Sequence, residues 1–84
     1  MGMDIYFLSE KTKLISTIDS LEPIKKELIE FEKRTGVLID EYGKTNLYLA
    51  HIKLLDKLID KPNEWKVIFE KAINLNSGLL IEGD

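Results

Sequence analysis

The sequence contains no cysteine, a single histidine, a single arginine and two prolines among its 84 residues. Without cysteine, the chain can form no disulfide, thiolate zinc site or cysteine nucleophile. Small secreted domains usually depend on disulfides, so their absence favours the cytoplasm. No apolar run approaches the roughly 18–20 residues that span a bilayer, and the N-terminus lacks the basic-then-apolar layout of a signal peptide. We therefore expect a cytoplasmic protein without membrane contact, in which residues 1–2 are a remnant of cloning.

Positive charge is also scarce. Twelve basic residues stand against fifteen acidic ones, which gives a net charge of −3. With Arg34 as the one arginine, guanidinium forks for phosphates or guanine are almost absent. Nucleic-acid binders concentrate Lys and Arg on one face and are usually basic overall. The sequence therefore argues against nucleic-acid binding, and its mild acidic excess is typical either of ordinary solvated charge or of a protein that meets a basic partner.

The motifs of catalysis and cofactor binding are missing. The chain has no paired-histidine metal motif and no carboxylate-rich calcium loop. Its five glycines are scattered and form neither a P-loop nor a dinucleotide fingerprint. A chain of this length supplies one domain with one core and leaves little material for a large cofactor cavity. We expect a single domain over residues 1–84, with no metal, no cofactor and no enzymatic activity.

Hydrophobic periodicity divides the chain into short strands and longer helices. Strands are predicted where short apolar, aromatic or β-branched runs occur, at 4–9, 37–40, 45–48 and 79–82. Apolar residues recur at helical spacing in four segments, at about 10–18, 21–35, 49–60 and 64–75. Neither a short strand nor a single helix can bury its apolar side alone, so the helices are expected to cover one face of a sheet. The sequence predicts an α+β fold with a small three- or four-stranded sheet and about four helices packed on it.

Polar residues and glycines punctuate these elements. Ser9 and Ser20 are predicted to cap the first two helices, and Asp60 or Asn63 the last one. Gly36 is expected to end the second helix in the left-handed conformation. The segments 37–40 and 45–48 are predicted to form a hairpin.

The stretch between those two segments is the first candidate site. Asp40, Glu41 and Tyr42 stand side by side before Gly43, which is expected to supply a positive φ in a turn. The turn alone explains the glycine. An exposed tyrosine beside carboxylates is also a common composition of protein-binding patches. Both interpretations are compatible, because turns on a rigid scaffold often carry contact residues.

The single histidine, His51, follows Leu47 by four residues and precedes Leu55 by four, beside the inward side of a predicted helix. It is interpreted either as a core-edge histidine satisfied by a local hydrogen bond or as a residue that contacts a partner or acts as a base beside Asp40.

Asp56 and Asp60 share a helix face at i,i+4 spacing and resemble paired catalytic carboxylates. Lys53 and Lys57 lie beside them, which favours a solvated charged face. This face is the second place where a partner is expected to bind.

A resemblance comes from the segment TGVLIDEYGKTNLYLAHIKLL. It is similar to the central segment of a group of small bacterial proteins, most of them uncharacterised. The shared residues are Thr35, Gly36, Ile39, Asp40, Tyr42, Gly43, Thr45, Leu47 and His51. In size and acidity these chains resemble the immunity proteins that neutralise bacterial toxins. The resemblance implies a stoichiometric inhibitor whose carboxylates stand in for the phosphates of a toxin's substrate.

Two functions follow as hypotheses. The first is a non-catalytic immunity or inhibitor protein that blocks a basic toxin domain, with contacts expected from Asp40, Glu41, Tyr42, His51, Asp56 and Asp60. The second is a small regulatory or adaptor protein, of the kind that phages or plasmids use to modulate a host protein. No catalytic residue is expected in either case.

Overall fold

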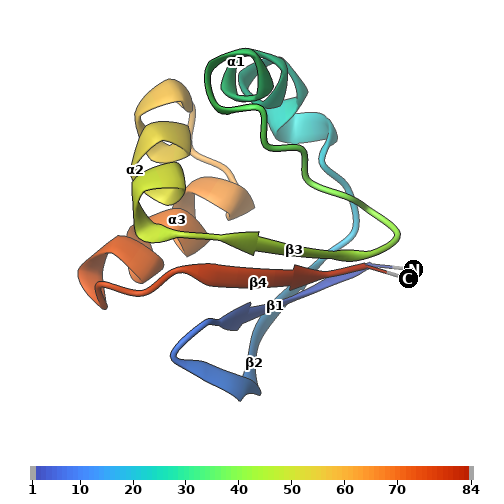
Figure 1. Cartoon of the computed structure of the whole chain (residues 1–84), viewed down its shortest axis with the longest axis vertical. Coiled ribbons are helices and arrows are strands. Elements are labelled where there is room, and N and C mark those ends of the chain that lie inside the picture. Colours follow the sequence, from blue (N-terminus) through green and yellow to red (C-terminus); the bar gives the residue numbers. More distant parts are fainter. Residues whose placement is uncertain (1, 84) are drawn as a thin grey trace.

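The computed structural model describes residues 2–83, which form a four-stranded antiparallel sheet and three α-helices (Figure 1). The strands are β1 (Met3–Phe7), β2 (Glu10–Ile18), β3 (Lys44–Leu47) and β4 (Leu79–Glu82). The helices are α1 (Lys25–Thr35), α2 (Leu49–Leu58) and α3 (Glu64–Asn74), and a short 3₁₀ turn, η1 (Glu22–Ile24), leads into α1. The α+β prediction is confirmed, with three α-helices in this part of the chain rather than about four. The interpretation of Met1 as a cloning remnant lies outside the described residues.

The strand order in the sheet is β2-β1-β4-β3, so strands from the two ends of the sequence lie side by side at its centre. Phe7 pairs with Leu79 at one end of the sheet, and Asp4 pairs with Glu82 near the other. Burial alternates along β4, where Leu79 and Ile81 are fully buried and their neighbours are not. One face of the sheet therefore forms the core with the helices, as expected for strands half-covered by helices.

The core is built from large side chains of all the layers. Phe31 from α1, Trp65 and Phe69 from α3, and Leu47 from β3 are fully buried. The Trp65 indole nitrogen donates a hydrogen bond of 3.0 Å to the Ser20 carbonyl oxygen. This bond satisfies the polar atom of a buried ring and fixes the start of η1 and α1 against α3.

The prediction of a helix at residues 10–18 is wrong, because this segment is the edge strand β2. Its three apolar residues at helical spacing were too few to outweigh β-branched side chains, which favour strands. Four such residues occur here: Thr12, Ile15, Thr17 and Ile18. As a strand, the segment pairs with β1 from Met3–Ile18 to Phe7–Glu10. Ser9 therefore lies in a hairpin connection and caps no helix.

The strand predicted at 37–40 is also absent from the described sheet, and so is the predicted hairpin with 45–48. β3 pairs instead with β4, from Lys44–Glu82 to Leu47–Leu79. The backbone N–H of Asp40 donates to the Thr45 hydroxyl rather than to a strand ladder. The Thr45 side chain therefore fixes the backbone at Asp40, where hydrogen bonds between two strands were expected.

Several element boundaries were predicted more accurately than the secondary structure of residues 10–18 and 37–40. Gly36 ends α1 with a φ of 75°, and its N–H donates to the Glu32 carbonyl oxygen. Asn63 caps α3 through a 2.9 Å bond from the Lys66 N–H to its side-chain oxygen. The predicted helix at 49–60 corresponds to α2, and the strand at 79–82 has the bounds of β4. Ser20 accepts a bond from the Glu22 N–H, but it caps no helix, because the N-cap of η1 is Leu21 and that of α1 is Ile24; the prediction of a Ser20 cap is wrong.

Candidate protein-binding site

The acidic turn, defined here as residues 40–43, links the extended segment after α1 to β3. The Asp40 carboxylate accepts a 2.9 Å hydrogen bond from the Tyr42 N–H, which closes the turn on its own side chain. The Gly43 N–H lies 3.4 Å from the Asp40 carbonyl oxygen. Among residues 2–83, positive φ in a glycine occurs at Gly36 and not at Gly43, so that part of the sequence prediction is wrong. A Cβ at Gly43 would lie 2.6 Å from the Asp40 carboxylate, so a larger residue there would have to displace that side chain.

Two contacts fasten the acidic turn to the sheet. The Asp40 N–H donates to the Thr45 hydroxyl over 3.0 Å, and the Gly83 N–H donates to the Gly43 carbonyl oxygen over 2.7 Å. Gly83 lies so close to the turn that a Cβ on it would collide with the Glu41 carbonyl oxygen. The backbone of the turn is therefore held against the end of β4 by bonds in which the Glu41 and Tyr42 side chains take no part.

The acidic turn is open to solvent. Asp40 and Glu41 are exposed, and Tyr42 is 78% exposed, more than Leu38 at 65% or Tyr48 at 59%. One carboxylate oxygen of Asp40 accepts the hydrogen bond within the turn. The Glu41 and Tyr42 side chains do not take part in this bond, so they are the two side chains of the turn that a partner can contact.

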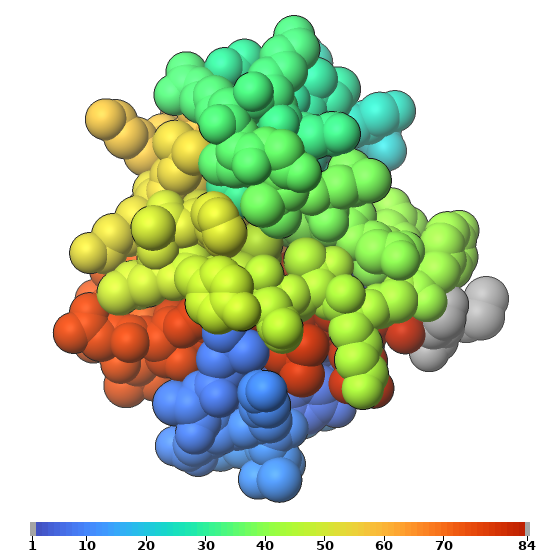
Figure 2. All heavy atoms as spheres, viewed as in Figure 1, coloured from blue at the N-terminus to red at the C-terminus, as the bar shows by residue number. Residues whose placement is uncertain are grey.

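Beside the turn, an open hollow of about 330 Å³ lies between α1 and the segment that follows it. We call it the apolar hollow, because Leu28, Ile29 and Leu38 lie in it, and Leu38 is 65% exposed. Its full lining is Leu21, Glu22, Lys25, Leu28, Ile29, Glu32, Leu38, Ile39 and Glu41. In Figure 2 the green surface of this part of the chain runs from α1 at the top toward the acidic turn at the right. Three glutamates against one lysine give the hollow an acidic rim.

The hollow was not predicted from the sequence. Residues 37–40 were predicted as a strand, and Ile29 lies off the inward stripe of α1, where a single exposed apolar residue needs no explanation. The available signal was that Ile29 stood outside the apolar stripe predicted for its helix. Only the return of residues 37–41 along α1 brings the two side chains to the same hollow.

His51 lies at the edge of the core, as one interpretation of the sequence expected. Its ring stands edge-on to Phe31, with centroids 5.8 Å apart and an interplanar angle of 89°. Its Nδ1 accepts a long hydrogen bond, 3.4 Å, from the Tyr48 N–H at the start of α2. The ring is half-buried. These contacts give His51 a structural role in joining α1 to α2.

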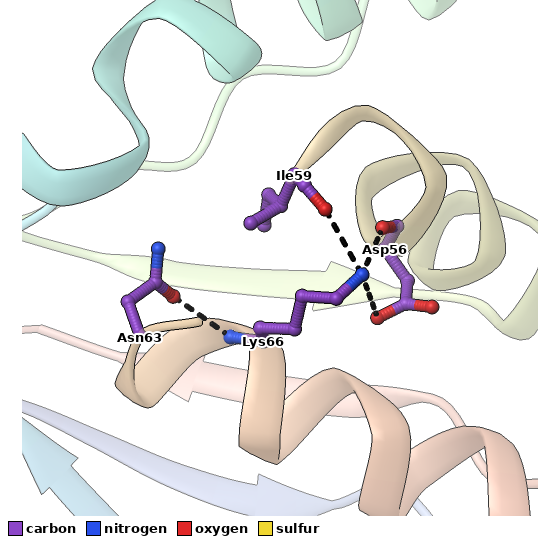
Figure 3. A network of polar contacts seen from close by, with 4 residues as sticks. All are labelled: Asp56, Ile59, Asn63 and Lys66. Atoms are coloured by element: carbon purple, nitrogen blue, oxygen red, sulfur yellow. Dashed lines mark hydrogen bonds and ion pairs between the residues drawn. The ribbon is translucent and has the colours of Figure 1, made fainter. Parts of the chain in front are cut away.

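Asp56 is bound into the fold. Its Oδ1 lies 3.3 Å from the Lys66 ammonium, and the two side chains are 23% and 25% exposed. The same ammonium donates hydrogen bonds of 2.7 Å and 2.9 Å to the carbonyl oxygens of Asp56 and Ile59 (Figure 3). The Asp56 Oδ1 atom is buried without a hydrogen bond, so its contact with Lys66 is ionic rather than a well-aligned bond.

The carbonyls at the end of α2 are thus satisfied by a lysine from α3. Asp60 is exposed and lies apart from this network, in an open polar hollow. That hollow is lined by Glu22, Pro23, Lys25, Lys26, Glu27, Glu30, Leu58, Asp60 and Lys61. The predicted shared face of Asp56 and Asp60 therefore separates into one residue that stabilises the fold and one in a surface of mixed charge.

Within residues 2–83, no three His, Asp or Glu side chains come close enough together to hold a metal ion. Over the same part of the chain, no helix combines the length and the apolar character needed to cross a membrane. Of the six residues predicted to contact a partner, Asp40, Glu41 and Tyr42 come together on one surface. Comparisons of the chain with protein-family models, with curated protein sequences and with solved structures found no significant match.

Proposed function

We propose that this chain is a non-catalytic protein-binding module that inhibits a basic partner, as an immunity protein inhibits a toxin domain. The observation that carries the proposal is the acidic turn, whose backbone is fixed by Asp40, Thr45 and Gly83 while Glu41 and Tyr42 stay exposed. Fixing a loop before binding lowers the conformational entropy lost in the complex.

The turn and the apolar hollow supply the two parts of a protein interface. Tyr42 offers a large amphipathic side chain with few rotatable bonds. Leu38 and Ile29 offer apolar area for a partner's side chain, and Glu32 and Glu41 surround it with negative charge. Such charge accelerates association with a basic surface.

The proposal assigns no catalytic role to the chain. His51, the one imidazole, is occupied by the Tyr48 N–H and the Phe31 ring, and Asp56 is occupied by Lys66. These contacts support structural roles for both residues rather than general acid–base roles. We place the protein in the cytoplasm on its lack of cysteine.

The test is capture from the source organism with the immobilised chain, followed by mass spectrometry and an activity assay on the captured protein. The proposal expects a basic protein whose activity falls to zero at one equivalent of the chain. The Glu41→Lys/Tyr42→Ala double variant should lose the capture, and an Asp60→Lys variant should keep it. A captured protein that stays fully active would favour the regulatory or adaptor function, and capture by both variants alike would move the interface elsewhere.

A further inference from the structure

A second surface lies at the opposite end of the sheet from the acidic turn. The turn is fastened beside Glu82, whereas the β1–β2 connection follows Phe7, which pairs with Leu79. Here β2 and the end of α3 enclose an open groove of about 400 Å³. We call it the β2–α3 groove; it is lined by Phe7, Lys13, Leu14, Ile15, Lys71, Asn74 and Leu75. In Figure 2 the blue hairpin and the orange-red end of α3 meet at the lower left.

The floor of the β2–α3 groove is apolar and open to solvent. Leu14 from β2 is 50% exposed, and Leu75 after α3 is 61% exposed. Phe7 and Ile15 are partly buried and continue this floor toward the core. Large apolar side chains gathered at one exposed place are typical of interaction surfaces, whereas single exposed ones are ordinary.

The charge of this groove is opposite to that of the apolar hollow. Lys13 stands on the strand side and Lys71 on the helix side, and both are exposed. No carboxylate lines the groove in the described part of the chain. In a protein with a net charge of −3, a groove with lysines on both walls selects for a negatively charged ligand.

The backbone of β2 adds the third observation. Within residues 2–83, β2 pairs with β1 along one edge and with no other strand, so its second edge is free. The register jumps from Tyr6–Leu14 to Phe7–Glu10, which leaves residues 11–13 without a partner on β1. A free strand edge beside side-chain pockets is the geometry to which an extended peptide adds as a further strand.

We propose that the β2–α3 groove docks an extended acidic segment of a partner protein. The segment pairs with the free edge of β2, seats an apolar side chain between Leu14 and Leu75, and places carboxylates near Lys13 and Lys71. A second copy of this chain fits less well, because Lys11 and Lys13 on its own edge strand would meet the same lysines, and like charges across strands are unfavourable.

The experiment uses the full chain, labelled with ¹⁵N, and the synthetic peptide acetyl-Glu-Leu-Glu-Val-Glu-Leu-amide as the probe. We expect its addition to shift the backbone amides of residues 10–16 and 71–75 and to leave those of residues 38–43 unchanged. The affinity should fall as salt is added, since the contacts are between exposed charges. Peptide in which lysine replaces each glutamate should not bind.

Variants of the two groove lysines test whether they contact the peptide. Lys13→Glu combined with Lys71→Gln should weaken peptide binding about tenfold or more through two lost charge-assisted contacts. Lys26→Glu, an exposed lysine on α1 outside the groove, should change it by less than about twofold. The proposal is overturned if millimolar peptide shifts no amide in the groove, if the lysine peptide binds equally, or if the double variant binds as the wild type does. Concentration-dependent shifts of residues 10–16 without peptide would overturn it in favour of a second copy.

Discussion

The acidic turn and the α2–α3 junction both carry aspartates that the sequence offered as contact residues, and the structure uses them in different ways. In the turn, one carboxylate, that of Asp40, fixes the backbone, and Glu41 and Tyr42 are left exposed. At the junction, Asp56 and Lys66 are both engaged, because the last carbonyls of α2 need a donor. The comparison shows that a charged residue becomes available to a partner only after the backbone around it has found its hydrogen bonds elsewhere.

The largest effect should come from breaking the junction. Lys66→Met removes the donor to two carbonyl oxygens and leaves the Asp56 carboxylate without its counter-charge. We expect a loss of about 2 kcal/mol in the free energy of unfolding, since a bond to a charged group contributes about 1.5–3 kcal/mol and these groups are partly screened by water. Urea unfolding measures it, with Lys53→Met, which replaces an exposed lysine of α2, as the control. Equal stability of the two variants would show that the junction is not held by Lys66.

Gly36 tests how the chain leaves α1 toward the turn. Its φ is 75°, and no atom lies within 4 Å of a Cβ built on it, so a side chain there meets strain rather than a collision. Gly36→Val should therefore lower the free energy of unfolding by about 1 kcal/mol or more. Gly36→Asn should cost less, because asparagine tolerates the left-handed region. Identical thermal melting of Gly36→Val and wild type would contradict this account of the helix end.

Asp40 separates the structural part of the acidic turn from the contact part. Asp40→Ala removes the 2.9 Å bond to the Tyr42 N–H, and we expect a loss of about 1 kcal/mol in unfolding free energy. Asp40→Asn retains an acceptor and should recover most of it. If alanine and asparagine are equally stable, the side chain does not fix the turn.

Glu41→Lys and Tyr42→Ala should each change the free energy of unfolding by less than about 0.5 kcal/mol, because both side chains are exposed. Against a cognate partner, Glu41→Lys should slow association and Tyr42→Ala should speed dissociation. Chemical denaturation and surface-bound kinetics measure the two effects separately. A strong loss of stability in either variant would show that the replaced residue stabilises the fold, as Asp56 does.

The smallest effect belongs to Glu30 on the surface of α1. Its hydrogen bond from Arg34, 2.7 Å long, together with the positive charge of that arginine, lowers the pKa of the Glu30 carboxyl. A lowered folded-state pKa contributes stability above the unfolded value of about 4.3, and this stability is lost as the pH falls through the folded value. Wild type should therefore exceed Arg34→Gln in stability slightly at neutral pH and equal it in strong acid. A difference that grows on acidification would contradict the pairing.

The sequence predicted the elements whose signals are local. Asn63 and Gly36 mark helix ends through bonds within a few residues, so both were found. Residues 10–18 carry two conflicting local signals, apolar residues at helical spacing and β-branched residues, and their pairing with β1 makes them a strand. Gly43 was expected to need a positive φ, whereas its φ is not positive and a Cβ there would meet the Asp40 carboxylate instead.

The candidate site follows the same rule. Asp40, Glu41 and Tyr42 are adjacent in the sequence, so composition alone pointed to them. Leu38 and Ile29 join them only because the chain turns back along α1. The engagement of Asp56 depended on Lys66, ten residues away on another helix, and no i,i+4 pattern announces such a contact.

The central claim is that Glu41 and Tyr42 serve binding while Asp56 and Lys66 serve the fold. It is tested most directly by measuring, for Glu41→Lys/Tyr42→Ala and for Lys66→Met, both the unfolding free energy and the affinity for the captured partner. We predict a double variant that is as stable as the wild type and fails to bind, and a Lys66→Met variant that is less stable and, while folded, binds with wild-type affinity. Full binding by the stable double variant would contradict the claim.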